Sequence, residues 1–110
     1  MVDQFIEGNF LGLPDVDGDA DVIIAAIPYE LTTSYGQGTA EGPAACIAAS
    51  GQVELFDHKL GQELPAGKKI RTVQPWSGEG NTLQEQLNGI GEYAAEQYNS
   101  GAFPIFLGGE

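Results

Sequence analysis

Two short apolar segments without a polar interruption constrain the fold of this chain more than any other feature. They are residues 22–27, VIIAAI, and residues 103–107, FPIFL. Apolar runs of this length that do not alternate with polar residues are typical of strands buried on both faces, as in parallel sheets. Helical patterns separate the strands along the chain. The sequence therefore predicts an α/β fold with a mainly parallel sheet.

Residue periodicity and turn signals predict the remaining elements. Pro43 opens a short, close-packing, alanine-rich helix that runs to Ser50, because a helix tolerates the missing N–H of proline in its first turn. A second helix begins after Asn81 or Thr82, either of which can cap it, and Gly101 terminates it. The apolar face of this amphipathic helix consists of Leu83, Leu87, Ile90, Ala94 and Tyr98.

The other segments give weaker signals. Residues 53–57 alternate apolar and polar side chains, which predicts a strand near a sheet edge. Residues 70–73 are a further candidate strand, and residues 1–14 are interpreted as an extended arm or a short strand. A single domain is the most that 110 residues allow.

Composition excludes several classes of function. Acidic residues outnumber basic ones 16 to 4, giving a net charge of −12, which disfavours nucleic acid and anionic membrane surfaces as partners. The basic residues, Lys59, Lys68, Lys69 and Arg71, are expected in a solvated loop. The one cysteine, Cys46, is expected to be a buried thiol in a reducing cytoplasm. No signal peptide and no apolar run of about 20 residues is found.

An acidic turn at residues 15–21, DVDGDAD, invites a calcium interpretation. An EF-hand loop requires glycine at its sixth position and glutamate at its twelfth. Counted from Asp15, those positions hold Ala20 and Ala26, so the segment is interpreted as a solvated turn before a strand.

The segment after the second apolar run carries a functional signal. Gly108, Gly109 and Glu110 follow it directly, and ligands of open α/β sheets bind beyond the carboxyl ends of the strands. The sequence is therefore expected to be the opening piece of a larger enzyme. Its loop at residues 29–41 follows the other apolar run and is rich in glycine and hydroxyl groups, which favours binding.

Three sets of residues resemble the arginase/agmatinase (ureohydrolase) family, and the agmatinase branch most. The sets are the motifs IPYE, TTSYG, GT and GP, in this order within residues 27–43; the stretch from Ala48 to Asp57; and FPIFLGGE at residues 103–110. The resemblance implies a three-layer α/β/α fold and a manganese-dependent hydrolysis of a guanidino compound, such as agmatine, to urea and an amine. Family members commonly have arginine where this chain has Ala40 and Ala44.

The resemblance also implies where the metal ligands belong. The first ligand histidine would follow Glu110, and the later aspartate and histidine ligand motifs are absent. We therefore expect no catalytic residue, no metal ligand and no bound manganese in these 110 residues. His58, the one histidine, is expected in a loop. Glu110 is a candidate partner of the absent ligand histidine.

Further binding candidates lie in the loop after the first apolar run. Glu30, Thr33, Ser34 and Tyr35 could meet a cationic guanidinium or amine, or could satisfy the local backbone instead.

We thus expect an inactive N-terminal portion, residues 1–110, of a single ureohydrolase domain. The alternative is a non-catalytic interaction module that forms a homo-oligomer through an open strand edge at residues 103–107.

Overall fold

The computed structural model describes residues 8–29, 38–78 and 80–108. The regular elements are η1 (Phe10–Gly12), β1 (Val22–Ile27), η2 (Thr39–Glu41), α1 (Gly42–Ser50), β2 (Phe56–Asp57), β3 (Gln62–Glu63), β4 (Ile70–Thr72), α2 (Leu83–Tyr98) and β5 (Phe103–Gly108).

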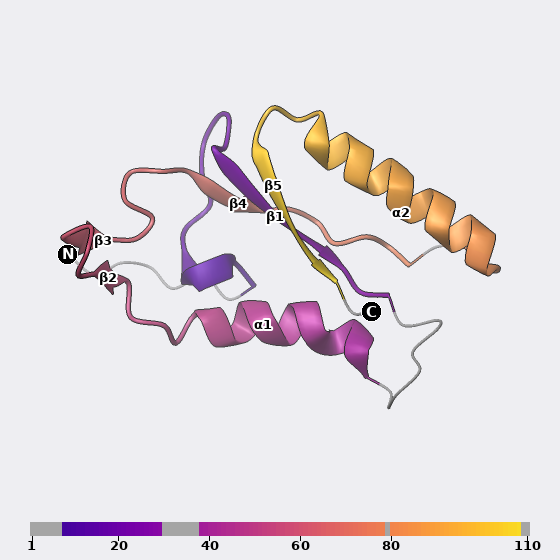
Figure 1. Ribbon diagram of the computed structural model, residues 1–110, viewed down its shortest axis with the longest axis horizontal. Helices are drawn as coiled ribbons and strands as arrows, with labels where there is room; N and C mark the ends of the chain where they lie inside the picture. The colour runs from indigo at the N-terminus through magenta and orange to yellow at the C-terminus, as the bar shows by residue number, and fades with distance from the viewer. Residues whose placement is uncertain (1–7, 30–37, 79, 109–110) are drawn as a thin grey trace.

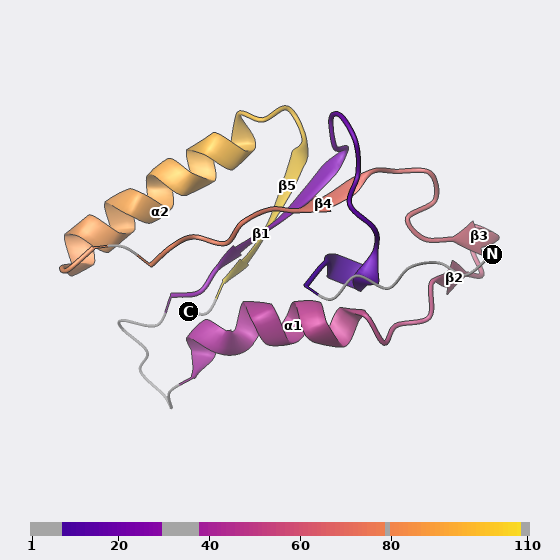
Figure 2. The same cartoon turned by 180° about the vertical axis from the view of Figure 1, so that it is seen from behind.

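The main sheet has three parallel strands in the order β4-β1-β5. β1 pairs with β5 along its whole length, from Val22 opposite Phe103 to Ile27 opposite Gly108. It pairs with β4 over three residues, beginning with Val22 opposite Ile70. Helix α1 lies on one face of this sheet and α2 on the other (Figures 1 and 2). The structure thus confirms the expected α/β class with parallel strands and helices in layers on both sides.

The core is centred on β1. Ile23, Ile24 and Ala25 are 2%, 1% and 0% exposed, so this strand is covered on both faces as its uninterrupted apolar run predicts. Successive side chains of β1 point to opposite faces of the sheet, so those on one face point toward α1 and those on the other face toward α2 (Figure 1). The expected segment at residues 103–107 is likewise a strand with a parallel neighbour.

Helix α1 forms where the proline signal places it, but its packing differs from expectation. Pro43 and Ile47 are buried, and so is Ser50, whose hydroxyl donates to the carbonyl of Ile47 and accepts from the N–H of Leu11 at 2.7 Å. The expected close packing of the alanines is wrong, because Ala44, Ala45, Ala48 and Ala49 are exposed. Cys46 is also exposed, which corrects the expected buried thiol, because the buried side of α1 consists of Pro43, Ile47 and Ser50 and leaves Cys46 outside it.

Helix α2 begins after Thr82, whose hydroxyl accepts the N–H of Glu85 at 3.1 Å. The carboxylate of Glu85 in turn accepts the N–H of Asn81 at 2.8 Å, so Thr82 is the cap and Asn81 precedes it. The expected apolar face is present but largely uncovered. Leu83 and Leu87 are exposed, and no residue of α2 is buried within the described part of the chain.

Residues 53–57 do not form the expected sheet-edge strand. The strand β2 contains only Phe56 and Asp57, and it pairs antiparallel with β3, apart from the main sheet. The cause is local, because the Asp57 carboxylate accepts the N–H groups of Lys59 and Leu60 at 2.9 and 3.0 Å and turns the chain back.

Residues 8–14, the described part of the expected arm, contain the short helix η1 in place of an extended strand. The N–H of Phe10 donates to the hydroxyl of Thr72 at 2.8 Å, and the N–H of Leu11 donates to Ser50 as above. These two side-chain acceptors satisfy the backbone locally, so the segment does not need a strand partner.

The acidic turn is bound to basic side chains of the neighbouring segment. The ammonium of Lys69 donates to the carbonyl of Asp17 at 3.0 Å, and the guanidinium of Arg71 donates to the carbonyls of Val16 and Gly18. The Asp21 carboxylate accepts the N–H of Lys69 at 2.8 Å. The expectation that all the basic residues lie in a solvated loop is therefore wrong for Arg71, which lies in β4 and is half-buried, whereas Lys69 is exposed in the loop before β4.

No helix in residues 8–29, 38–78 or 80–108 is long and apolar enough to cross a membrane.

Candidate functional site

The order of the strands shows where a crevice for a ligand is expected in an open α/β sheet. The chain passes from β1 through α1 to β4 on one side, and then through α2 to β5 on the other side of β1. Because α1 and α2 cover opposite faces, the carboxyl ends of β1 and β5 meet at a topological switch point (Figure 1). Pro28 and Tyr29 leave β1 at this point, and Gly108 ends β5 there.

An aromatic pair supports the carboxyl end of β1. Tyr29 and Trp76 are 9% and 6% exposed and meet edge to face, with 6.2 Å between their ring centroids. The backbone N–H of Trp76 donates to the carbonyl of Ala26 at 2.9 Å, which ties the segment after β4 to β1. On α2, a Cβ added to Gly89 would lie 3.3 Å from the indole nitrogen of Trp76, so glycine allows the helix to approach. Trp76 therefore belongs to the core.

The hydroxyl of Tyr29 is buried and has no hydrogen-bond partner in the described part of the chain. Buried polar groups in native proteins are nearly always paired, because an unpaired one costs about 1–3 kcal/mol. The sequence analysis placed Tyr29 at the start of a loop and missed this feature. A tyrosine directly after a buried strand and a proline is the signal that could have indicated it.

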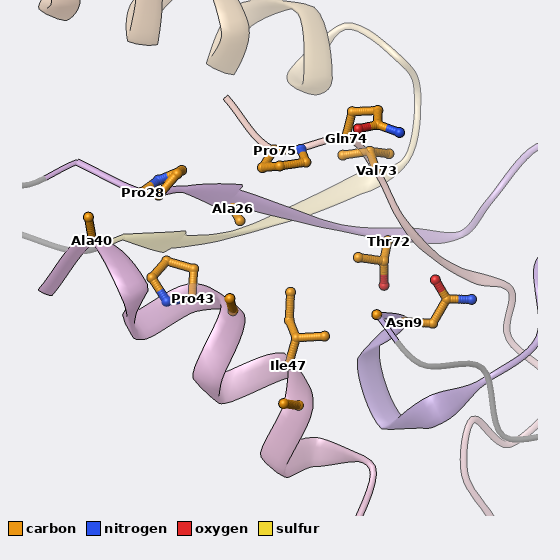
Figure 3. Close-up of a pocket in the computed structure, with 13 residues that line it drawn as sticks. Asn9, Ala26, Pro28, Ala40, Pro43, Ile47, Thr72, Val73, Gln74 and Pro75 are labelled. Atoms are coloured by element: carbon orange, nitrogen blue, oxygen red, sulfur yellow. The ribbon is translucent and has the colours of Figure 1, made fainter. Parts of the chain in front are cut away.

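A cavity of about 490 Å³ lies between α1, the carboxyl half of β1 and the segment after β4 (Figure 3). None of its lining residues carries a charge, and the hydroxyl of Thr72 is already bonded to Phe10. Ala40 and Ala44, which stand where the family resemblance implies arginine, both line it. The cavity is therefore suited to apolar contacts and lacks the carboxylate that a guanidinium ligand requires.

The binding candidates from the sequence lie outside the described residues. These are Glu30, Thr33, Ser34, Tyr35 and Glu110. The segments that precede them are described and are neighbours, because Ile27 and Gly108 are paired at the ends of β1 and β5.

His58 is not at the switch point. It lies beside β2, is exposed, and meets the ring of Phe56 edge to face at 5.2 Å between centroids. The expectation of a loop histidine is confirmed, because His58 lies in an exposed turn after β2. β2 belongs to the small two-stranded sheet and not to the main sheet.

The residues that the structure describes do not fit a manganese site. No group of three or more histidine, cysteine, aspartate or glutamate side chains within the described ranges is arranged to hold a metal ion. The oxygen and imidazole ligands that Mn²⁺ prefers would have to come from residues other than the described ones.

One titrating group near the aromatic pair is perturbed. Burial raises the pKa of Tyr93 above its ordinary value of 10.0, and the negative charge of Glu96 raises it further. The Tyr93 hydroxyl donates to the carbonyl of Gln74 and so fastens α2 to the segment that leads to Trp76. This contact is structural and lies outside the crevice.

Comparison with known proteins agrees with this architecture. The model of the arginase family matches residues 20–110, which is most of the chain. The chain belongs to the arginase family. The match includes all three strands of the parallel sheet and both long helices. The resemblance drawn from the motifs at residues 27–43 and 103–110 is thereby confirmed.

Individual relatives of the family are ureohydrolases. The chain is 33% identical over 100 residues to N(1)-aminopropylagmatine ureohydrolase of Synechocystis sp. and 33% identical over 92 residues to agmatinase of Bacillus anthracis. It is 29% identical over 92 residues to N(1)-aminopropylagmatine ureohydrolase of Thermus thermophilus. Each match covers 84% of this chain and 31% of the relative, so the chain spans about a third of their length.

Proposed function

We propose that this chain supplies the N-terminal portion of an agmatinase-like ureohydrolase, which hydrolyses a guanidino compound to urea and an amine. The observation that carries the proposal is the family match over residues 20–110, together with relatives that are agmatinase and N(1)-aminopropylagmatine ureohydrolase. The switch-point crevice supports it, since the loop after β1 and the segment after β5 leave from paired strand ends.

The role of this portion is to form and hold the crevice. Enzymes of the arginase family are generally manganese-dependent, and metal ions supply a hydroxide nucleophile at neutral pH. The described residues do not group to bind such an ion. The chain therefore contributes the strands that position the loops, and the aromatic pair of Tyr29 and Trp76 that rigidifies the end of β1.

We further propose that the 110 residues alone are inactive and that Glu30, Thr33, Ser34 and Tyr35 face the substrate in the complete enzyme. Glu30 offers the carboxylate that a cationic guanidinium or amine requires and that the cavity beside α1 lacks.

Two proteins test this proposal. The first is the 110-residue chain, which should release no urea from agmatine or N(1)-aminopropylagmatine with Mn²⁺. The second is a chimera in which residues 20–110 replace the matched segment of the Bacillus anthracis agmatinase, and it should release urea. Urea release by the chain alone, or a folded, manganese-loaded chimera without activity, would contradict the proposal.

Within the chimera, extended at its start by residues 1–19 of this chain, Glu30→Gln should raise KM for agmatine while the protein stays folded. Glu7→Gln is the control. Both changes remove one negative charge, but Glu7 precedes the matched residues 20–110. An equal change in KM for the two variants would contradict the placement of Glu30 at the substrate site.

A second candidate function is a non-catalytic module that forms homo-oligomers through β5. The outer edge of β5 favours it, because this edge has no strand partner among the described residues and unpaired strand edges bind other chains. Sedimentation of the pure chain separates the two: a folded monomer at high concentration excludes the module.

A further inference from the structure

The cavity beside α1 is formed by elements within the described part of the chain, and no residue that lines it belongs to β5. Pro43 and Ile47 of α1 are buried and give it an apolar floor, opposite Ala26 of β1 (Figure 3). Ala44 and Ala48 of the same helix also line the cavity but are exposed. The cavity is therefore a pocket that opens to solvent along α1.

The loop that carries the proposed substrate residues begins and ends at this cavity. Pro28 lines the cavity at the carboxyl end of β1, where the loop begins, and Ala40 lines it in η2, just before α1. Pro75, in the segment after β4, lines it as well, so the carboxyl ends of two neighbouring parallel strands meet there. Ligands of open α/β sheets bind beyond such strand ends. The cavity is therefore next to the proposed substrate loop.

The cavity is poorly suited to a positive charge. None of its lining residues is charged, and two of its polar side chains already have partners. The side-chain amide of Asn9 donates to the carbonyl of Leu13 at 2.7 Å, and the hydroxyl of Thr72 accepts the N–H of Phe10 at 2.8 Å. An ammonium group that enters such surroundings loses its hydration and meets no carboxylate in exchange.

An alkyl chain suits the same surroundings. The volume of about 490 Å³ lies within the range of small-molecule pockets, about 300–1,000 Å³. The short side chains of Ala44 and Ala48 leave the opening along α1 free for a ligand. Each methylene group that leaves water for an apolar pocket strengthens binding by about fourfold.

We propose that this cavity binds the uncharged alkyl tail of the substrate, so that the enzyme prefers alkylguanidines to agmatine. The inference rests on the proposed function, in which the loop carboxylate of Glu30 meets the guanidinium group. Agmatine ends in an ammonium group, whereas pentylguanidine has a methyl group at the same place and is otherwise identical. The two compounds therefore differ only in the group that the cavity receives.

The reaction of such a substrate is an ordinary hydrolysis. Water adds to the guanidinium carbon, and the bond between this carbon and the alkyl nitrogen breaks. The products are urea and an alkylamine, and the departing nitrogen takes up a proton. The reaction needs no oxidant, reductant or second organic substrate. Because the tail takes no part in these bond changes, the cavity affects the choice of substrate and not the chemical step.

The chimera extended by residues 1–19 tests the proposal, because Gly8 and Asn9 line the cavity. Its kcat/KM for pentylguanidine should exceed that for agmatine by about tenfold or more. From ethylguanidine to pentylguanidine, KM should fall by about fourfold with each added methylene group. A kcat/KM for agmatine that equals or exceeds that for pentylguanidine would overturn the proposal, and so would a KM that does not depend on tail length. Either result leaves the proposed function intact, since agmatine hydrolysis tests that function separately.

Matched variants of α1 locate the preference. Ala44→Glu should lower the ratio of the two kcat/KM values, pentylguanidine to agmatine, by about tenfold or more, because its carboxylate can pair with the ammonium group. Ala45→Glu is the control, since Ala45 is exposed on the same helix but does not line the cavity. Ala48→Glu, with Ala49→Glu as its control, gives a second test in case Ala44→Glu misfolds. Equal ratios in a variant and its control would overturn the proposal.

Direct binding tests the cavity independently of urea release. In the chimera kept free of metal, pentylguanidine should shift the methyl NMR signals of Ile47 and Val73, which line the cavity. Calorimetry should show that pentylguanidine binds about tenfold or more tightly than agmatine. An inactive chimera that gives both results would contradict only the proposed function. Unshifted methyl signals at saturation, or equal affinities for the two compounds, would overturn the assignment of the tail to this cavity.

Discussion

β1 and β5 are neighbouring strands of equal length, yet their environments differ sharply. Ile24 and Ile105 are partners in the parallel register, and they are 1% and 40% exposed. Both strands derive from uninterrupted apolar segments, which the sequence analysis interpreted in the same way. The difference teaches that such a segment predicts a strand, whereas the cover on its faces depends on the elements that surround it.

The largest difference between the two strands should appear when each isoleucine is truncated. Ile24→Ala should destabilise the chain by about 2–5 kcal/mol, because it leaves a cavity in the core. Ile105→Ala should cost only about 1 kcal/mol, since much of its side chain already meets water. Urea unfolding followed by circular dichroism measures both. Equal losses would mean that β5 is as well covered as β1.

Replacing one serine on the covered side and one on the open side of the molecule compares how much each side contributes to the free energy of unfolding. Ser50→Ala should cost about 1–3 kcal/mol, because the N–H of Leu11 loses its acceptor beside a buried side chain. Ser100 also bonds the backbone, accepting from Ala102 at 3.3 Å, but it is exposed before β5. Ser100→Ala should change the free energy of unfolding by less than about 0.5 kcal/mol. If Ser100→Ala lowered the free energy of unfolding more than Ser50→Ala does, the side of the molecule at β5 would be the better packed one.

The cap of α2 offers a smaller test on the open side. Thr82→Ala should destabilise the helix by about 1 kcal/mol, because the N–H of Glu85 loses its acceptor. Thr82→Ser keeps the hydroxyl and should stay close to the unaltered chain. Helical circular dichroism during thermal unfolding detects the change. If both variants behave alike, the hydroxyl does not cap α2.

The smallest effect concerns pH. The pKa of Tyr93 is raised in the folded state, by burial first and by Glu96 second, so the folded chain holds this proton more tightly than the unfolded chain. Its contribution is fully present below the ordinary pKa of 10.0 and is lost as the pH rises through the folded value. Between about pH 9 and about pH 11, the free energy of unfolding should therefore fall less steeply in Tyr93→Phe than in the unaltered chain. Parallel curves for the two proteins would contradict this assignment.

The sequence predicted the elements that are defined by strong local signals. The apolar run at Val22, the proline at Pro43 and the capping residues Asn81 or Thr82 act within a few residues, so they set strand and helix positions correctly. The motifs also predicted the family. The short strand β2 was misjudged because the Asp57 turn competes with the alternating pattern before it.

Features that depend on distant neighbours could not be predicted. Cys46 was expected inside but is exposed, and so are Ala44, Ala45, Ala48 and Ala49 of α1. The bonds from Lys69 and Arg71 to the acidic turn connect residues about 50 positions apart. Among the described residues, the buried hydroxyl of Tyr29 has no hydrogen-bond partner. The ring of Tyr29 packs against Trp76, which comes from a different segment of the chain.

The central claim is that β5 pairs with β1 on one side and, among the described residues, is open on the other. Residue-resolved amide exchange of the chain alone tests it most directly. The account predicts alternation along β5, with slow exchange at Phe103, Ile105 and Leu107 and fast exchange at Phe106 and Gly108. Uniformly slow exchange along the strand, or uniformly fast exchange, would contradict it.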